Sequence, residues 1–157
     1  MNSMSNNNTE NFVGLVIGSS DERIKILCAD GIVTLNCKLK VKPQLFSIAE
    51  FTTIKQRIIT TYIIEQNHEL TKDIKKYYLA CAICEVVAKI YPNKDIFLLT
   101  VKAFDMLKEN NNTREIFTFY FLNLLELLGY GCEHDQDINT AFIRHLDIQI
   151  PNTKHFL

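Results

Sequence analysis

The sequence lacks a long apolar run, an excess of charge of one sign and any catalytic motif. Its most apolar stretch, residues 116–130, is interrupted by Asn123 and Glu126 and falls short of the roughly 18 residues that a membrane span requires. Seventeen Lys and Arg oppose eighteen Asp and Glu, a formal net charge of −1, which argues against a polycation that wraps DNA over its whole surface. Any contact with nucleic acid must therefore be a local patch.

Motifs for catalysis or metal binding are missing or poorly placed. There is no Gly-Lys-Ser phosphate loop, no nucleophile elbow and no HExxH pair, so we expect no enzymatic activity. Cys81 and Cys84 have the spacing of zinc ligands and redox dithiols, and Cys132 with His134 could complete a site. A mid-helix position in an apolar run is more typical of buried thiols, so we expect no metal and no cofactor. A metal or thiol enzyme centred on Cys81 and Cys84 remains a third alternative.

Five Cys residues without a dense framework indicate reduced thiols, and hence a cytoplasmic location. The polar residues 1–11 carry no basic region followed by an apolar segment, so we expect a disordered tail rather than a secretory signal.

Two halves of the chain have different periodicities. Residues 12–68 contain about five alternating segments and an Asp30-Gly31 hairpin signal, which predicts a small antiparallel β-barrel or half-barrel. Residues 69–157 repeat apolar positions at three and four, which predicts a helical bundle. The expected fold class is therefore α+β, with the barrel first.

Cap residues predict the helix ends in the second half. Thr71, Asn93 and Thr113 are each expected to begin a helix, because their side chains can accept a hydrogen bond from the first turn. Pro92 is expected to stop the first helix, and Gly129 to close the third. The expected helices cover residues 71–90, 93–109, 113–129 and 136–146.

A strand-like run at residues 33–42, VTLNCKLKVK, alternates apolar and polar positions without exception. Its polar side carries Lys38, Lys40 and Lys42, spaced about 6.6 Å apart on one face, which is similar to the spacing of successive phosphates. The segment between Arg23 and Arg57 has seven basic and two acidic residues, a net charge of +5. The candidate DNA-binding residues are Arg23, Lys25, Lys38, Lys40, Lys42, Lys55 and Arg57.

Two interpretations of these lysines stay open. Lysines on solvent-facing strand positions protect a sheet edge from aggregation, and they also bind phosphates when they cluster on a small barrel. Phe46 and Phe51 lie an odd number of residues apart and are both expected in the core, so no conspicuous stacking aromatic accompanies the cations. Binding would then depend on charge and weaken steeply with salt.

The third expected helix is rich in bulky apolar residues and should lie at the centre of the bundle. An alternative for one end of it is a groove in which Phe117, beside Arg114, receives an apolar and acidic peptide of a partner.

A predicted strand domain is followed by a recurring pattern in the helical half. The pattern includes Tyr78-Leu79-Ala80, Ile96-Phe97-Leu98-Leu99 with Ala103 and Leu107, and the segment YFLNLLELLGY at residues 120–130. With this order of domains and these residues, the chain resembles the RecO family of recombination mediators, most closely in the helices and in outline in the strands. In the last segment the family's aromatic residue falls on Tyr120, its paired leucines on Leu124 and Leu125, and its closing Leu-Gly-Tyr on residues 128–130. The likeness covers about residues 12–131.

The resemblance implies an oligonucleotide-binding (OB) fold joined to a helical domain, and a noncatalytic DNA repair and recombination mediator in the bacterial cytoplasm. It implies binding and annealing of single- and double-stranded DNA, on a surface that maps best to Lys38, Lys40 and Lys42. The implied protein partners are the acidic tail of the single-strand binding protein, RecR and, indirectly, RecA. Family members commonly continue into a cysteine-rich zinc element, whereas only Cys132 and a brief tail follow here, so we expect no zinc. The alternative function is a protein-interaction adaptor with a structural barrel and a peptide-binding helical domain.

Overall fold

The computed structural model describes residues 8–131 and 137–157. The chain forms two units, one of Met1–Cys28 with Ile32–Gln66 and one of Ala29–Gly31 with Asn67–Leu157. The first contains most of the strands and the second contains the helices.

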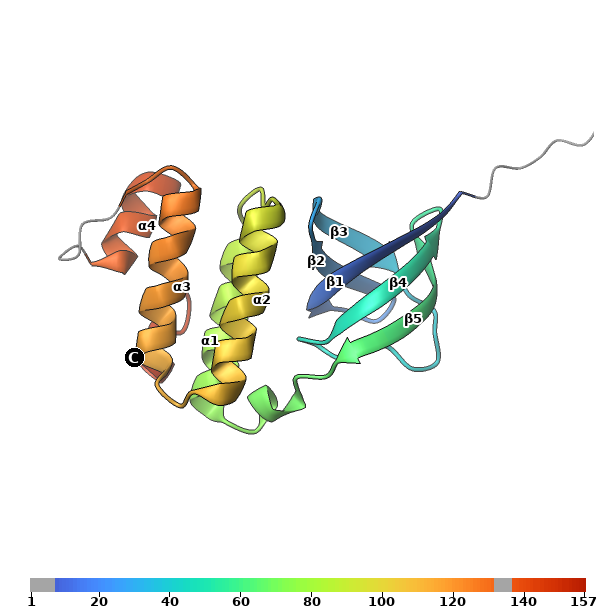
Figure 1. Cartoon of the computed structure of the whole chain (residues 1–157), viewed down its shortest axis with the longest axis horizontal. Coiled ribbons are helices and arrows are strands. Elements are labelled where there is room, and N and C mark those ends of the chain that lie inside the picture. Colours follow the sequence, from blue (N-terminus) through green and yellow to red (C-terminus); the bar gives the residue numbers. More distant parts are fainter. Residues whose placement is uncertain (1–7, 132–136) are drawn as a thin grey trace, which may run out of the picture. The chain divides into compact units, whose positions relative to one another are not determined.

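Five strands form the first unit, in the order β1-β2-β3-β5-β4, and the sheet closes on itself (Figure 1). Neighbours β1 and β2, β1 and β4, and β4 and β5 are antiparallel, but β3 meets β5 in parallel, through the pair Asn36 and Arg57. The strands are β1 (Thr9–Ser19), β2 (Arg23–Cys28), β3 (Gly31–Asn36), β4 (Ile48–Ile54) and β5 (Arg57–Glu65). This five-stranded sheet is OB-like, and together with the helices that follow it confirms the expected α+β class. The expectation of purely antiparallel strands is wrong at the closing pair, because the connection from β3 crosses to β4 before the chain returns as β5.

The interior of the barrel is built from alternate residues of its strands. The core cluster comprises Val16, Ile24, Ile26, Leu35, Cys37, Ala49, Phe51 and Ile58. Phe12 packs against it, with its ring centroid 5.6 Å from that of Phe51. Phe46 and Phe51 are both fully buried, which confirms their predicted core positions.

The first strand starts earlier than the sequence predicted. Thr9, Glu10 and Asn11 belong to β1, where their backbone pairs with β4, so the expectation of a disordered tail over residues 1–11 is wrong from Thr9 onward. Their polar side chains suit this position because they are exposed, and Thr52 Oγ1 donates a hydrogen bond of 2.7 Å to Asn11 Oδ1. Residues 1–7 of the expected tail lie outside the described residues.

The predicted strand over residues 33–42 is wrong in its second half. β3 ends at Asn36, so the three lysines lie in the β3–β4 connection and not on one strand face. Exposure still alternates as far as Lys40, because Leu39 packs against the barrel core, but Val41 is 83% exposed and breaks the pattern. Pro43, which has no N–H to donate, also disfavours a longer strand. The alternation of apolar and polar residues therefore continues in the sequence beyond the point at which the backbone pairing of β3 ends.

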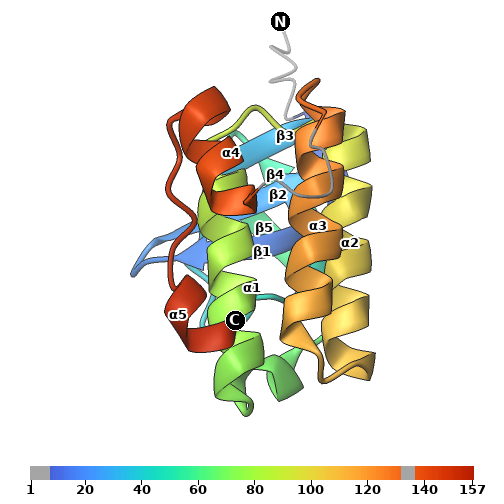
Figure 2. The same ribbon diagram turned by 90° about the vertical axis from the view of Figure 1, so that its left-hand side faces the viewer.

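The helices of the second unit are η1 (His68–Thr71, a 3-10 helix), α1 (Ile74–Val87), α2 (Lys94–Glu109), α3 (Thr113–Leu127), α4 (Ile138–Leu146) and α5 (Thr153–Phe156). α1, α2 and α3 pack together with short connections, α4 packs on α3, and α5 packs on α1 (Figures 1 and 2). The predicted bundle is confirmed, whereas the short α5 was not predicted. None of the described helices has the length and apolarity needed to cross a membrane.

Two of the five predicted helix-end residues are confirmed directly. The Asn93 side chain accepts a hydrogen bond from Ile96 N at the start of α2, and Gly129 adopts a φ of +89° just after α3. The first predicted cap is wrong, because Asp73 accepts from Lys75 N and so begins α1, while Thr71 closes the preceding 3-10 turn.

The predicted cap of α3 is displaced by one residue. Asn112 accepts from Glu115 N, and the hydroxyl of Thr113 instead donates a 2.6 Å bond to the carbonyl of Phe156. This bond ties α5 to the start of α3. Thr113 is buried, so its hydroxyl needs a partner inside the fold rather than a place at the helix end.

Candidate functional site

The seven predicted basic residues lie in three places on the barrel unit. Arg23 and Lys25 are on β2, Lys55 and Arg57 flank the β4–β5 turn, and the remaining three are in the β3–β4 connection: Lys38, Lys40 and Lys42. All are exposed except Lys42, which is half-buried.

Two backbone hydrogen bonds bring these three places together. Cys37 N donates to Glu22 O at 2.8 Å, which joins the end of β3 to the β1–β2 loop. Asn36 N donates to Gln56 O at 3.0 Å, which joins the end of β3 to the β4–β5 turn. Arg23, Lys38 and Arg57 are the sequence neighbours of the bonded residues, so three segments that each carry a cation adjoin at one end of the barrel. We name Arg23, Lys38, Lys55 and Arg57 the basic rim.

The other predicted cations relate differently to the basic rim. The Lys42 ammonium donates a 2.8 Å hydrogen bond to the Ser20 carbonyl in the β1–β2 loop, so it reaches the same loop but is partly engaged there. Lys25 lies two residues from Arg23 on exposed positions of β2. Lys40 is exposed between Lys38 and Lys42, and no hydrogen bond holds it to the rim within the described chain.

A hollow of about 260 Å³ lies beside Arg23 and Lys25. It is lined by Gly18, Ser19, Ser20, Arg23, Lys25 and Thr34. Hydroxyl groups and cationic side chains donate hydrogen bonds that phosphate oxygens accept, so this hollow has the chemistry of an anion site. Its hydroxyl residues were not predicted from the sequence, although Gly18-Ser19-Ser20 before an acidic turn is a visible signal of a loop.

These side chains are not ion-paired in the described chain, although carboxylates lie near some of them. None of the seven forms an ion pair with a carboxylate in the part of the chain that the structure describes. The carboxylates of Asp21 and Glu22 are in the same β1–β2 loop, and both residues are exposed. Edge protection does not account for Lys38 and Lys40, because neither lies on a strand.

The β4–β5 turn has an unusual conformation for its residues. Lys55 and Gln56 have φ values of +48° and +63°, the left-handed region in which Asn-Gly is favoured in such turns. Each non-glycine residue in that region costs about 1 kcal/mol, and the turn presents Lys55 and Arg57 on either side of Gln56. A two-residue hairpin turn of this type requires a positive φ at both central residues, so the short connection between β4 and β5 accounts for the strain.

One exposed aromatic residue on the barrel was not predicted from the sequence. Tyr62 on β5 is 72% exposed, and its cross-strand neighbour on β4 is Glu50, which is also exposed. A carboxylate beside the ring disfavours phosphate, so Tyr62 does not extend the basic rim.

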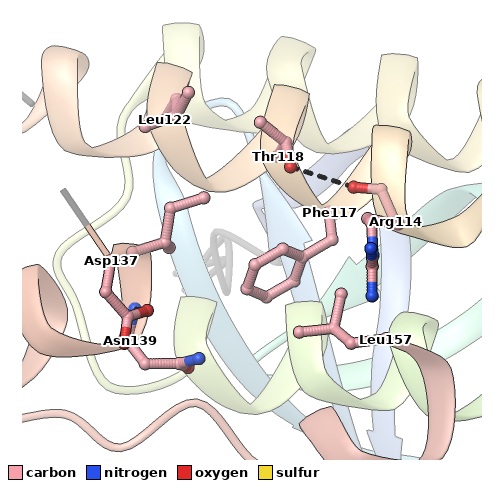
Figure 3. Close-up of a pocket in the computed structure, with 8 residues that line it drawn as sticks. Arg114, Phe117, Thr118, Leu122, Asp137, Asn139 and Leu157 are labelled. Carbon is pink, nitrogen blue, oxygen red and sulfur yellow. Dashed lines mark hydrogen bonds between the residues drawn. The ribbon is translucent and has the colours of Figure 1, made fainter. Parts of the chain in front are cut away.

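A second candidate site lies in the helical unit and contains both predicted partner-binding residues, Arg114 and Phe117 (Figure 3). It is a cavity of about 370 Å³ lined by Arg114, Phe117, Thr118, Leu122, Asp137, Ile138, Asn139 and Leu157. We name it the α3–α4 groove. Phe117 is only 4% exposed and its ring packs 4.9 Å from Phe121, so it forms a fixed apolar floor.

The two charged residues of the α3–α4 groove differ in whether their side chains already have partners. The Asp137 carboxylate caps α4 by accepting from Asn139 N, and its second oxygen accepts from the Thr140 hydroxyl. The Arg114 side chain is exposed and forms no ion pair with a described carboxylate. The groove therefore combines an apolar floor with one available cation.

The surroundings of the candidate dithiol favour the protonated form of both sulfurs. Burial raises the pKa of the Cys84 thiol well above its ordinary value. Burial also raises the pKa of Cys81, with a smaller contribution from Glu85, while a hydrogen bond from Tyr77 acts in the opposite direction. No three His, Cys, Asp or Glu side chains gather within the described ranges, and Cys132 and His134 lie outside them. A thiolate site at Cys81 and Cys84 therefore lacks chemical support.

Residues 71–147 match the family model described as the C-terminal region of recombination protein O. The chain belongs to the RecO family. The match runs from the end of η1 through α4, so it covers the helices that pack around Tyr120 and the α3–α4 groove. As a member of the RecO family, the chain has a role in DNA repair and recombination, with DNA and repair proteins in general as its partners. No curated protein matches the chain.

Proposed function

We propose that this RecO family member is a noncatalytic DNA repair mediator that binds DNA through the basic rim. The observation that supports this most directly is the meeting of three cation-bearing segments at one end of the barrel, without ion pairs in the described chain. Lys25, Lys40 and Lys42 extend the contact along β2 and the β3–β4 connection. OB folds bind oligonucleotides through the face of strands 2 and 3 and through the loops between strands 1 and 2 and between strands 4 and 5.

Contacts of this type suit strand annealing and recombinase loading. Ammonium and guanidinium groups bind phosphates and leave the base edges free, so a second strand can pair with the bound one. Release of counterions drives such binding, so affinity should fall steeply as salt rises. The whole chain has a net charge of −1, so the positive charge that attracts DNA is confined to a local patch on the barrel.

A fluorescence titration with labelled single-stranded oligonucleotide at low and high salt tests the proposal. The double substitution Lys38→Glu and Lys40→Glu should weaken binding strongly, and it should reduce the slope of log K against log salt by about 0.7 for each phosphate that is no longer bound. The matched control is Lys72→Glu with Lys75→Glu, two exposed lysines of the helical unit with the same change in net charge. Absence of binding at low salt would sink the proposal, and so would equal titrations for the two double variants.

The α3–α4 groove supports a second, compatible role in partner docking. We propose that it receives the acidic, Phe-containing tail of the single-strand binding protein, with an apolar ring over Phe117 and a carboxylate on Arg114. The fixed apolar floor and the available guanidinium carry this proposal. RecR, and through it RecA, complete the proposed set of partners.

Binding of a synthetic acidic peptide that ends in Phe, measured by fluorescence anisotropy, tests the groove. Arg114→Ala should weaken peptide binding strongly, because a charge-assisted hydrogen bond would be removed. Arg144→Ala, an exposed arginine on α4 outside the groove lining, is the control. Peptide binding without any DNA binding would favour the adaptor alternative instead.

A further inference from the structure

We propose that the α1–α2 turn, residues 88–93, is a second contact for single-stranded nucleic acid. In this contact a base stacks on the ring of Tyr91, and the flanking phosphates bind Lys89 and Lys94. The inference rests on the proposed function for the class of ligand, but it uses different residues in the other unit of the chain.

Tyr91 is 99% exposed, which is unusual for an aromatic ring in an ordered turn. The backbone on both sides is held. Lys89 N and Ile90 N donate to Val86 O and Val87 O at the end of α1, at 3.0 and 3.3 Å. Pro92 then restricts Tyr91 to an extended backbone.

The far side of the turn is equally fixed. Asn93 caps α2 through its side chain, which accepts from Ile96 N, and its carbonyl accepts from Phe97 N at 2.9 Å. The ring is therefore presented from a rigid support, and a stacked base would order little additional backbone.

The charges around Tyr91 are balanced. Lys89 and Lys94 are exposed on either side, and neither forms an ion pair in the described chain. Exposed carboxylates lie on both flanking helices, Glu85 on α1 and Asp95 in the first turn of α2. Stacking must therefore contribute more than charge at this turn, in contrast to the basic rim.

Tyr62 provides an internal comparison. It is also a largely exposed tyrosine, but it lies on a strand opposite Glu50 and has no lysine within three residues in the sequence. If exposure alone made a tyrosine a stacking platform, both rings would bind bases. If flanking cations are needed, only Tyr91 would do so.

The chain has no tryptophan, so a single Tyr91→Trp substitution in the full chain introduces a unique fluorophore. Addition of unlabelled oligo(dT) should quench the emission of that variant, whereas Tyr62→Trp should keep its emission. Tyr91→Ala should weaken oligonucleotide binding about tenfold, and Tyr91→Phe should bind as the wild type does. Circular dichroism checks that the variants are folded.

The outcomes separate this inference from the proposed function. Unquenched emission of Tyr91→Trp under saturating oligo(dT), or wild-type affinity of Tyr91→Ala, overturns the turn contact while binding that depends on Lys38 and Lys40 survives. Quenching of Tyr91→Trp that persists after Lys38→Glu and Lys40→Glu supports the turn contact and counts against the basic rim. No binding by the wild type overturns both.

Discussion

The barrel unit and the helical unit hold their candidate binding residues in different kinds of structure. In the barrel, the basic rim lies in turns and strand ends outside an interior of mainly aliphatic residues. In the helical unit, the floor of the α3–α4 groove is Phe117, which is itself part of the aromatic core. Contacts made by charge, at the basic rim or at Arg114, can thus be changed without touching a core, whereas the apolar contact with Phe117 cannot.

The largest predicted effect is loss of the aromatic core beneath the groove. Phe121→Ala should lower the free energy of unfolding of the helical unit by about 3–5 kcal/mol, because a large cavity would form. The Phe121 ring contacts Phe117, Tyr120 and Phe142 at centroid distances of 4.9, 5.0 and 5.3 Å. Denaturant unfolding followed by circular dichroism measures the loss, and peptide binding should fall with it.

Phe51→Ala in the barrel is the matched comparison, since Phe51 is also fully buried. It should destabilise the barrel unit by a similar amount and leave the helical signal and peptide binding unchanged. If Phe51→Ala instead removes both signals together, the two units unfold as one and the contrast between them fails.

A smaller effect is expected for the buried hydrogen bonds of the helical core. Thr100 Oγ1 donates to Ile96 O at 2.8 Å and lies 2.9 Å from the Tyr120 hydroxyl, which therefore acts as the donor to Thr100. Tyr120→Phe keeps the ring but removes this donor, so it should cost about 1–2 kcal/mol. Thermal or denaturant unfolding at pH 7 measures the difference.

The same substitution has a predicted pH dependence. Burial, with a smaller effect from Cys84, raises the pKa of Tyr120 above its ordinary value of 10.0, while a hydrogen bond that Thr100 can donate to the ionised phenolate acts in the opposite direction. The folded chain therefore holds this proton more tightly than the unfolded chain. Its contribution is complete below pH 10 and falls by about 1.4 kcal/mol per pH unit above it. Wild type minus Tyr120→Phe should show this decline between pH 10 and 11, and a constant difference would contradict it.

The helical half could be predicted well from the sequence because its signals are local. Asn93 and Gly129 fulfil their predicted roles within one turn of the helix that each bounds. The misplaced caps at Thr71 and Thr113 arose because a neighbouring Asp or Asn competes for the same role, and burial of Thr113 decided the second case.

The barrel could be predicted less well because strand ends depend on distant partners. Lys38 and Lys40 continue the alternation of β3, but the ladder ends where Asn36 meets the β4–β5 turn, about twenty residues away in sequence. The grouping of Arg23 with Lys38 and Arg57 depends on the same nonlocal bonds. Composition identified the cations, and only the folded structure shows which of the segments that carry them adjoin.

The smallest predicted effect concerns the strained β4–β5 turn and sharpens the contrast between stability and binding in the barrel. Gln56→Gly should raise the unfolding free energy of the barrel by up to about 1 kcal/mol, because glycine adopts the observed φ of +63° without a Cβ clash. It retains Lys55 and Arg57, so oligonucleotide affinity should stay the same. Lys55→Asn relieves similar strain but removes a cation of the basic rim, and should weaken binding. Denaturant unfolding and oligonucleotide titration of both variants measure these effects, and equal affinities would show that Lys55 is outside the contact.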